Sequence, residues 1–295
     1  MDTIRLKALA KINIGLDVLR RREDGYHDVK MIMQTVGIYD QICLNREKTP
    51  GIRVKTNLFY LPDNENNLVY KAAKLLMDEF SIEDGVSIDL NKYIPVAAGM
   101  AGGSSDAASV LYGMNKMFSL GLSRDELMRR GVKIGADVPY CIMRGTALAE
   151  GIGEILTPLP PMPACFVLVA KPGISVSTKF VYENLHANDL RPEQHPDIDA
   201  AIAGIRAGDL RATARAMGNV LELVTVREYP VIEEIKNFMK KRGALNAMMS
   251  GSGPTVFGLF ENKTTARNAF YQLRRTSLAK QVYLTEIYNN RRQRV

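Results

Sequence analysis

The 295 residues allow one large or two medium domains, and 46% hydrophobic and 24% charged residues are ordinary for a globular protein. No apolar run approaches the ~18 residues that span a bilayer. Charges interrupt the first eleven residues, so we expect no signal peptide. Cys43, Cys141 and Cys165 are widely spaced and form no metal-ligand pair, which favours reduced thiols in a cytoplasmic protein.

The formal net charge of +7 raises the question of a nucleic-acid partner. The basic residues are spread along the chain, apart from short clusters at 20–22 and 291–294. A spread excess is typical of a solvated surface and also suits anionic small substrates. We therefore expect no nucleic-acid partner and keep a non-catalytic RNA-binding protein as an alternative.

The first half of the chain contains both strand and helix patterns. Alternating apolar residues predict strands, and apolar residues at helical spacing predict helices. In chain order we expect strands over 3–19 and 29–45, a helix over 67–80, a strand over 86–91, and β-structure over 140–149. Ser104 or Ser105 is expected to cap a helix, and Ser123 is expected to cap another that reaches about residue 134.

Four prolines between residues 158 and 163 mark the predicted domain boundary. We place an N-terminal domain at 1–155 and a C-terminal domain at 156–295. In the second domain the patterns predict strands at 166–170, 245–249, 254–260 and 281–288, and helices at 177–184, 197–206, 208–217, 229–241 and 264–275. The expected fold class is α+β in two halves.

The most informative segment is the glycine-rich stretch 95–105, which carries Gly99, Gly102, Gly103 and two serines before a helix. Such a turn exposes backbone amides at a helix N-terminus, where a phosphate binds well. The stretch lacks the Gly-Lys-Ser/Thr ending of a P-loop and does not fit Gly-x-Gly-x-x-Gly. A plain turn without a ligand is the alternative, and the paired serines favour a site.

Two further positions could carry the chemistry. Lys11 interrupts an apolar strand beside Asn13 and could reach an anionic substrate, although a lone lysine is more often a surface residue. Asp137 lies between a helix end and a proline, where it could act as a general base or serve only as a turn aspartate.

Two loops could contribute to binding. Tyr26 and His27 follow an Asp-Gly pair and could stack on a base, or they could simply form a hairpin. The segment 250–255 (Ser-Gly-Ser-Gly-Pro-Thr) is either a tight hairpin or a second loop that approaches the ligand.

The order of these motifs resembles the GHMP kinases, a superfamily that includes galactokinase, homoserine kinase and mevalonate kinase. The resemblance runs essentially from end to end. The Gly-Tyr-His loop at 25–27 and the Lys-Ile-Asn at 11–13 narrow it to members that phosphorylate a cytidine diphosphate-linked methylerythritol in the non-mevalonate route to isoprenoids. Ala97, Ala98 and Ala101 stand where many relatives have glycine, and we expect each to have a negative φ.

The resemblance implies a two-domain fold, with an N-terminal domain like a ribosomal-protein β-α-β unit and a C-terminal α/β sandwich. It implies that ATP binds with its phosphates on the glycine-rich stretch, assisted by Mg²⁺, with Asn67 and Leu68 bordering the adenine. The implied phosphate-binding positions are Pro95, Val96, Ala97, Ala98, Gly99, Met100, Ala101, Gly102, Gly103, Ser104 and Ser105.

The same resemblance assigns the catalytic roles. Asp137 matches the base that accepts the hydroxyl proton, and Lys11 matches its cationic partner; both also contact the substrate. The remaining matches are Tyr26 and His27 at the cytosine, and Asn13, Thr178 and Lys92 near other substrate or nucleotide contacts. The implied reaction moves the γ-phosphoryl group of ATP to a 2-hydroxyl.

Several alternatives stay open. The acceptor could instead be homoserine, mevalonate or a sugar, and the Gly-Tyr-His loop argues for the cytidine compound. A relative that binds ATP without catalysis would have no need to keep both Lys11 and Asp137. The metal ligands, and the choice between a monomer and a homodimer, are not fixed by the sequence.

Overall fold

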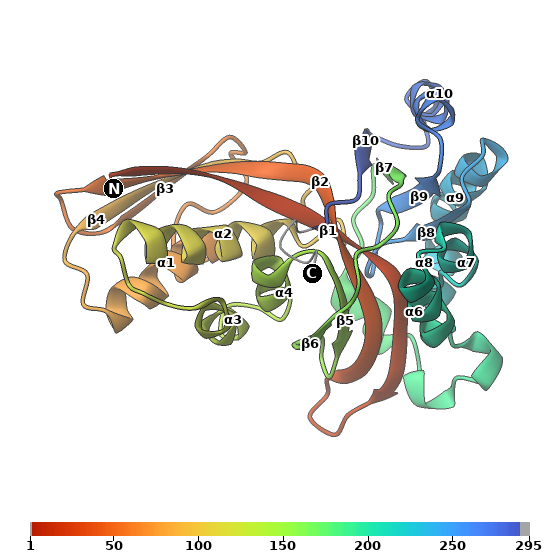
Figure 1. Ribbon diagram of the computed structural model, residues 1–295, viewed down its shortest axis with the longest axis horizontal. Helices are drawn as coiled ribbons and strands as arrows, with labels where there is room; N and C mark the ends of the chain where they lie inside the picture. The colour runs from red at the N-terminus through yellow and green to blue at the C-terminus, as the bar shows by residue number, and fades with distance from the viewer. Residues whose placement is uncertain (1, 290–295) are drawn as a thin grey trace. The chain divides into compact units, whose positions relative to one another are not determined.

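The computed structural model describes residues 2–289, which form two compact units (Figure 1). Unit 1 comprises residues 2–10, Ile38–Val96 and Ala101–Met143, and unit 2 comprises Lys11–Gly37, Ala97–Met100 and residues 144–289. The units interleave along the chain, whereas the predicted domains are contiguous. The boundary near residue 155 therefore stays a prediction.

The strands of unit 1 come from four segments of the chain. They are the start of β1 (Thr3–Arg21), the second half of β2 (His27–Glu47), β3 (Ile52–Thr56) and β4 (Gly85–Asn91). β4 pairs antiparallel with β2 and parallel with β3, and β1 pairs with β2. β3 was not predicted. It is a five-residue strand at the edge of the sheet, and its apolar alternation is too short to stand out in the sequence.

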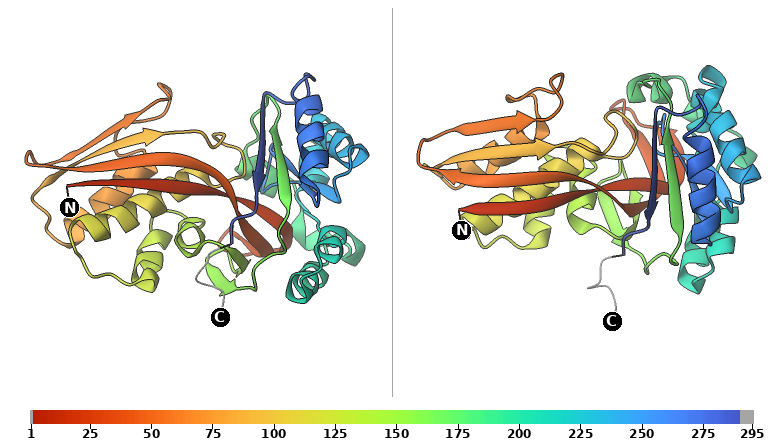
Figure 2. Two further views of the ribbon diagram at one scale, coloured as in Figure 1. Left: turned by 45° about the horizontal axis from the view of Figure 1, so that its top comes forward. Right: turned by 90° about the horizontal axis from the view of Figure 1, so that it is seen from above.

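Four helices complete unit 1: α1 (Leu68–Glu79), α2 (Gly102–Met117), α3 (Arg124–Val132) and α4 (Val138–Met143). Figure 2 shows α1 and α2 side by side along one face of the strands. The Asn67 side chain caps α1, and Ser123 forms a capping box with Glu126 at the start of α3, as predicted for Ser123.

The prediction of β-structure over 140–149 is wrong for its first half. α4 occupies that half, and β5 (Thr146–Glu150) begins only after it. Tyr140, Cys141 and Met143 are all buried, so the segment is apolar on every side and has no readable period. Pro139 favours the helix because proline fits the first helical turn.

Unit 2 contains an antiparallel sheet in the order β10-β7-β9-β8. Its strands are β7 (Phe166–Lys171), β8 (Asn246–Met249), β9 (Val256–Phe260) and β10 (Gln281–Glu286). The helices α9 (Val231–Lys241) and α10 (Lys263–Leu273) cover one face of this sheet (Figure 2). β9 is buried along its whole length, which makes it the centre of the core of this unit.

Besides parts of β1 and β2 and two short 3-10 helices, unit 2 contains β5, β6 (Ile155–Pro158), α5 (Thr178–Glu183), α6 (Ile198–Ala207), α7 (Leu210–Arg215) and α8 (Glu222–Glu228). β5 pairs with the first half of β2 and with β6. β6 and α8 were not predicted, because β6 is four residues long and α8 has no side-chain cap among the described residues. None of the helices within residues 2–289 is long and apolar enough to cross a membrane. The predicted α+β class is confirmed.

Candidate functional site

The glycine-rich stretch leads directly into the N-terminus of α2, which begins at Gly102. The prediction that Ser104 or Ser105 caps this helix is wrong. The N-cap is Ala101, and the Ser105 hydroxyl is buried and donates a hydrogen bond to the Leu9 carbonyl (2.7 Å). Because no described side chain caps α2, its first-turn amides are left to a ligand or to water.

Two alanines of the stretch have the left-handed backbone conformation. Ala97 has φ of 50° and Ala101 has φ of 54°, so the expectation of negative φ is wrong for both. A residue with a Cβ pays roughly 1–2 kcal/mol in this conformation. The turn that prepares the α2 N-terminus is therefore held under backbone strain by its surroundings.

Replacing either strained alanine by glycine should stabilise the protein. The relief of about 1–2 kcal/mol exceeds the ~0.4–1 kcal/mol that glycine adds to the flexibility of the unfolded chain. We expect Ala97→Gly and Ala101→Gly each to raise the free energy of unfolding by roughly 0.5–1 kcal/mol in urea titrations. Ala98→Gly is the matched control: Ala98 is buried without positive φ and should lose stability. Losses of equal size in all three variants would contradict the strain.

A buried cluster of three charged side chains lies beside the start of α2. The Lys92 ammonium binds the carboxylates of Asp40 and Asp106, the latter at 2.6 Å, and all three side chains are at least 96% buried. Asp40 also accepts hydrogen bonds from the backbone amides of Tyr93 and Ile94. A Cβ on Gly102 would lie 3.1 Å from Lys92 Nζ, so the glycine lets the helix start approach the cation closely. The cluster thus holds an ammonium close to the α2 N-terminus, with its charge balanced by the two carboxylates.

Burial and the neighbouring charges set the ionisation of this cluster. Burial raises the pKa of Asp106 well above its usual range, and Asp40 adds to the rise while Lys92 opposes it. Burial alone would lower the pKa of Lys92, but the two carboxylates outweigh it and raise the pKa. Lys92 is therefore a stable cation. Only Lys92 of the three was a candidate from the sequence.

Unit 1 also places the other candidates near the first turn of α2. A Cβ on Gly103 would touch Leu68 Cδ1 at 3.4 Å, and Asn67 caps the helix that Leu68 begins. A Cβ on Gly135 would lie 4.0 Å from Ser104 Oγ. Asp137 follows two residues later, is half-buried, and its carbonyl accepts the first backbone bond of α4 from Cys141 (3.0 Å).

In unit 2, the segment Ser250–Thr255 is the turn between β8 and β9, and it packs on the glycine-rich stretch. The Ser250 hydroxyl donates to the Gly99 carbonyl at 2.9 Å. A Cβ on Gly99, whose φ is +69°, would lie only 2.1 Å from the Ser250 carbonyl oxygen. Because β8 and β9 pair antiparallel across this turn, the hairpin interpretation is confirmed, and the hairpin turn also contacts the predicted phosphate loop at Gly99.

Lys11 is not a surface residue: it is 5% exposed, in the middle of β1. Its ammonium donates to Asn13 Oδ1 at 2.9 Å, and its backbone amide donates to the Met100 carbonyl at 3.1 Å. Unit 2 thus ties Lys11 and Asn13 to each other and to the glycine-rich stretch. A lysine is seldom buried without a specific role or partner.

Tyr26, His27 and Thr178 belong to a neighbouring part of unit 2. Tyr26 is 60% exposed on the loop before β2, and the His27 ring lies 5.0 Å from the ring of Tyr182 in α5. Burial, followed by the charge of Arg21, lowers the pKa of His27, so its imidazole is neutral at pH 7. The Thr178 hydroxyl is 2.7 Å from Ser252 Oγ, which joins α5 to the hairpin turn.

Comparisons with known proteins identify the family. Residues 67–145 match the model of the GHMP kinases N terminal domain, and residues 201–278 match that of the GHMP kinases C terminal domain. A 4-diphosphocytidyl-2-C-methyl-D-erythritol kinase of Lachnospira eligens is 58% identical over 98% of this chain and 99% of its own length. This chain belongs to the GHMP kinase family. As a member of that family it is a small-molecule kinase.

Further relatives and solved structures extend the comparison. A relative of the same printed name from Clostridium perfringens is 50% identical over 97% of this chain and 99% of its own. A crystal structure of 4-(cytidine 5'-diphospho)-2C-methyl-D-erythritol kinase is 31% identical, with a TM-score of 0.82 over 97% of this chain and all of that one. Homoserine kinase from Cytophaga hutchinsonii, 20% identical with a TM-score of 0.78 over 97% of this chain and 95% of that one, shares the fold.

Proposed function

We propose that this kinase transfers the γ-phosphoryl group of ATP to the 2-hydroxyl of 4-diphosphocytidyl-2-C-methyl-D-erythritol, giving the 2-phosphate and ADP in non-mevalonate isoprenoid synthesis. The observation that carries the proposal is the 58% identity, over nearly the whole of both chains, to a kinase named for that acceptor. The Gly-Tyr-His loop at 25–27 and the Lys-Ile-Asn at 11–13 favour the same acceptor within the family.

The stretch 95–105 would hold the phosphates of ATP. The uncapped amides of α2 and the helix dipole favour a dianionic group at Gly102 and Gly103. Lys92 lies close to Gly102, but Asp40 and Asp106 balance its charge, so the amides and the dipole of α2 provide the main attraction for the phosphates. Leu68 lies against Gly103, which suits an adenine held beside the phosphates and bordered by Asn67 and Leu68.

The residues present also fit a magnesium ion. Mg²⁺ is usually held by one or two carboxylates together with substrate phosphates and water. Asp106 Oδ1 is buried and has no hydrogen-bond partner within residues 2–289, so this carboxyl could hold the ion, whose charge, like that of Lys92, would lower the raised pKa of Asp106. Ser105 precedes it in the chain. No group of three or more acidic, His or Cys side chains in the described chain could bind a metal alone. When bound, Mg²⁺ would neutralise phosphate charge.

Asp137 and Lys11 would carry the transfer itself. Asp137 would accept the proton of the 2-hydroxyl as its oxygen attacks the γ-phosphorus, and Lys11 would stabilise the negative charge that develops on the transferred group. The bond from the γ-phosphorus to the β-γ bridging oxygen breaks, and ADP leaves with that oxygen. The two residues belong to different units, so their pairing rests on the resemblance to the family.

Tyr26 and His27 would hold the cytosine of the acceptor, with Asn13 and Thr178 completing the substrate contacts. The exposed Tyr26 ring offers a stacking face, and the neutral His27 imidazole offers one donor and one acceptor. Pyrimidine edges present both kinds of group, so a neutral imidazole suits them better than a cation.

Tyr26→Ala should therefore raise KM for the cytidine acceptor while leaving KM for ATP unchanged. Loss of one stacking contact, about 1–3 kcal/mol, corresponds to an increase of roughly 5- to 150-fold. Steady-state kinetics with each substrate varied in turn measures both constants. Tyr271→Ala is the matched control, because Tyr271 is similarly exposed on α10. A rise confined to KM for ATP would remove Tyr26 from the acceptor site.

Isothermal titration calorimetry tests the choice of acceptor without turnover. We expect heat with CMP and CDP and none with galactose or mevalonate. Binding of mevalonate or a sugar, without CMP, would favour another GHMP kinase, and a steeply salt-dependent RNA affinity without ATP use would favour the RNA-binding alternative. On our proposal the protein acts in the cytoplasm on small molecules, as a monomer or homodimer and without a nucleic-acid partner.

A further inference from the structure

The segment 218–223 of unit 2 joins two elements that carry candidate site residues. Its backbone is hydrogen-bonded to Leu16 of β1. Leu16 N donates to the Gly218 carbonyl (2.9 Å), and Val220 N donates to the Leu16 carbonyl (3.0 Å). Leu16 lies five positions after Lys11 on the same strand. The other side of the segment faces the end of β8 and the hairpin turn.

Two side chains of this segment hold the backbone of that turn. The Asn219 amide donates to the carbonyls of Met249 (2.9 Å) and Gly251 (2.8 Å), and its Oδ1 accepts from Leu221 N (3.0 Å). Glu222 Oε1 accepts from Met249 N (2.7 Å). Asn219 is 7% exposed and uses both amide protons, so its hydrogen bonds are shielded from water.

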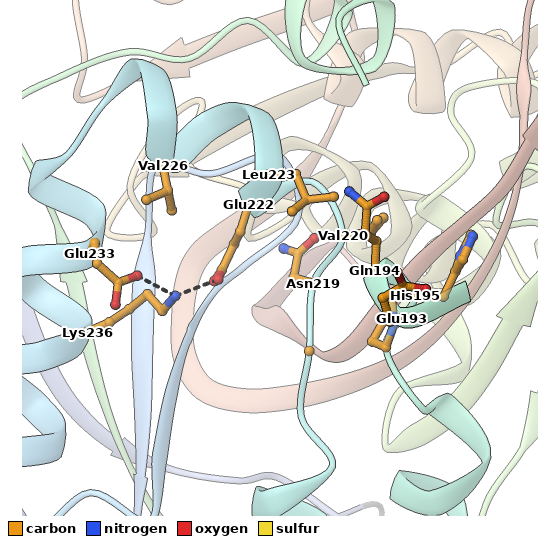
Figure 3. A pocket seen from close by; sticks show the side chains of 12 residues that line it. Glu193, Gln194, His195, Asn219, Val220, Glu222, Leu223, Val226, Glu233 and Lys236 are labelled. Carbon is orange, nitrogen blue, oxygen red and sulfur yellow. Dashed lines mark hydrogen bonds and ion pairs between the residues drawn. The ribbon is translucent and has the colours of Figure 1, made fainter. Parts of the chain in front are cut away.

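Figure 3 shows how Asn219 and Glu222 are placed at the edge of a pocket of about 380 Å³. Glu222 is fixed from the other side by Lys236, which also binds Glu233 (2.6 and 2.7 Å). Burial would lower the pKa of Lys236, but these two carboxylates raise it, so the cation persists. Lys236 thus holds Glu222 in place, and Glu222 and Asn219 both form hydrogen bonds to the backbone at the end of β8 and in the turn.

The held turn is the part of unit 2 that touches the glycine-rich stretch. A Cβ on Gly251 would lie 3.3 Å from Gly99 Cα, and the Ser250 hydroxyl donates to the Gly99 carbonyl. A displacement of the Gly251 carbonyl would therefore move the atoms that pack on Gly99. The path from Asn219 to Gly99 consists of its hydrogen bond to the Gly251 carbonyl and, one residue earlier in the turn, the hydrogen bond from Ser250 to the Gly99 carbonyl.

We propose that Asn219 is a positioning residue for ATP binding: it holds the turn Ser250–Pro254 in place, and that turn supports Gly99 in the phosphate-binding conformation. This inference rests on the proposed function for the identity of the ligand. Asn219 touches neither the predicted phosphate positions nor the acceptor positions in the described structure, so it acts through the turn.

The variant Asn219→Asp tests the role. The carboxylate keeps an acceptor for Leu221 N but can no longer donate to the two carbonyls. We expect the Kd for ATP, measured by calorimetry on the full chain, to rise about tenfold, because two buried carbonyls lose their partners. The Kd for CMP should stay within about twofold, since the turn reaches the acceptor side only through the Thr178–Ser252 hydroxyl pair and no such contact joins it to Tyr26 or His27.

Asn115→Asp is the matched control. Asn115 is also 7% exposed, and its amide also donates to a backbone carbonyl, that of Leu122 (2.8 Å). Asn115 lies at the C-terminal end of α2, so Asn115→Asp should lower Tm by a similar amount while leaving the affinity for ATP unchanged. Equal Kd values for ATP in the two variants, or an unchanged Kd in folded Asn219→Asp, would overturn the proposal. Asn219→Ser, which keeps one donor, takes its place if Asn219→Asp does not fold.

Hydrogen exchange of the protein without nucleotide provides a readout that does not depend on activity. Peptides covering 249–257 should exchange faster in Asn219→Asp than in Asn115→Asp, because the turn loses its anchor. Unchanged exchange there would contradict the anchoring step. If wild-type protein binds ATP but does not phosphorylate the cytidine acceptor, the proposed function fails while this test of positioning still stands.

Discussion

Asp137→Asn is expected to lower kcat by ~10²–10⁴-fold, the usual contribution of a positioned general base. The amide matches the carboxylate in shape but cannot take up the proton that leaves the acceptor hydroxyl. The affinity for ATP should stay within about twofold, because the uncapped α2 amides and the helix dipole provide the partial charge that the phosphates meet. Single-turnover kinetics with saturating substrates measures the chemical step directly.

Asp125→Asn is the matched control for this variant. Asp125 is an exposed acidic residue in the first turn of α3, within the same unit, and its loss should leave kcat unchanged. Near-normal turnover in Asp137→Asn would remove Asp137 from the role of base. A large loss of ATP affinity with normal kcat would instead make it a nucleotide contact.

Of the substitutions described above and here, Lys92→Met should lower the free energy of unfolding the most. The substitution leaves the buried carboxylates of Asp40 and Asp106 without their shared cation. Removing one partner of a buried ion pair costs about 3–5 kcal/mol. Urea titration at pH 8 should show this decrease in the free energy of unfolding. Lys74→Met, which breaks the exposed pair with Asp78, is the control and should leave stability essentially unchanged.

The loss in Lys92→Met should shrink as the pH falls. In the wild type, burial already raises the pKa of Asp106, and the variant removes the cation that opposes this rise. A carboxyl whose pKa is higher in the folded than in the unfolded state lowers the free energy of unfolding at pH values above its unfolded pKa. This loss disappears as the pH falls through the folded pKa and then the unfolded pKa. The gap from wild type should therefore be smaller at pH 5 than at pH 8. A gap independent of pH would contradict the charge argument.

Local signals in the sequence were enough for most of the fold. Long strands such as β2 and amphipathic helices such as α1 have clear periods in their apolar residues, and the capping box of Ser123 marks the start of α3. The failures occur where the local signal is absent or misleading. Residues 138–143 are apolar on all sides, so helix and strand could not be distinguished.

The start of α2 shows why a capping preference can mislead. Ser104 and Ser105 are good N-cap residues, yet Ala101 takes that position in a left-handed conformation. The contact between Ser105 and the Leu9 carbonyl spans 96 positions, so local rules could not include it. Tertiary contacts here outweigh both the cap preference and the cost of a positive φ.

The candidate site was predicted as a set of motifs, whereas its supporting residues were missed. Asp40 lies 52 positions from Lys92, and no local pattern joins them. The pairing of β2 with β4 would have provided the signal, because Gln41 opposite Asn91 brings Asp40 opposite Lys92. Asn219 had no signal at all, since its role depends on the path of a turn 30 residues away.

The central claim, phosphorylation of a cytidine diphosphate-linked acceptor, is tested most directly by a coupled assay of ADP release. The wild-type chain is supplied with ATP, Mg²⁺ and one acceptor at a time: 4-diphosphocytidyl-2-C-methyl-D-erythritol, mevalonate or homoserine. We predict ADP release with the first acceptor that disappears in Asp137→Asn, and only background release with the other two. Turnover with mevalonate or homoserine, and none with the cytidine compound, would contradict the account.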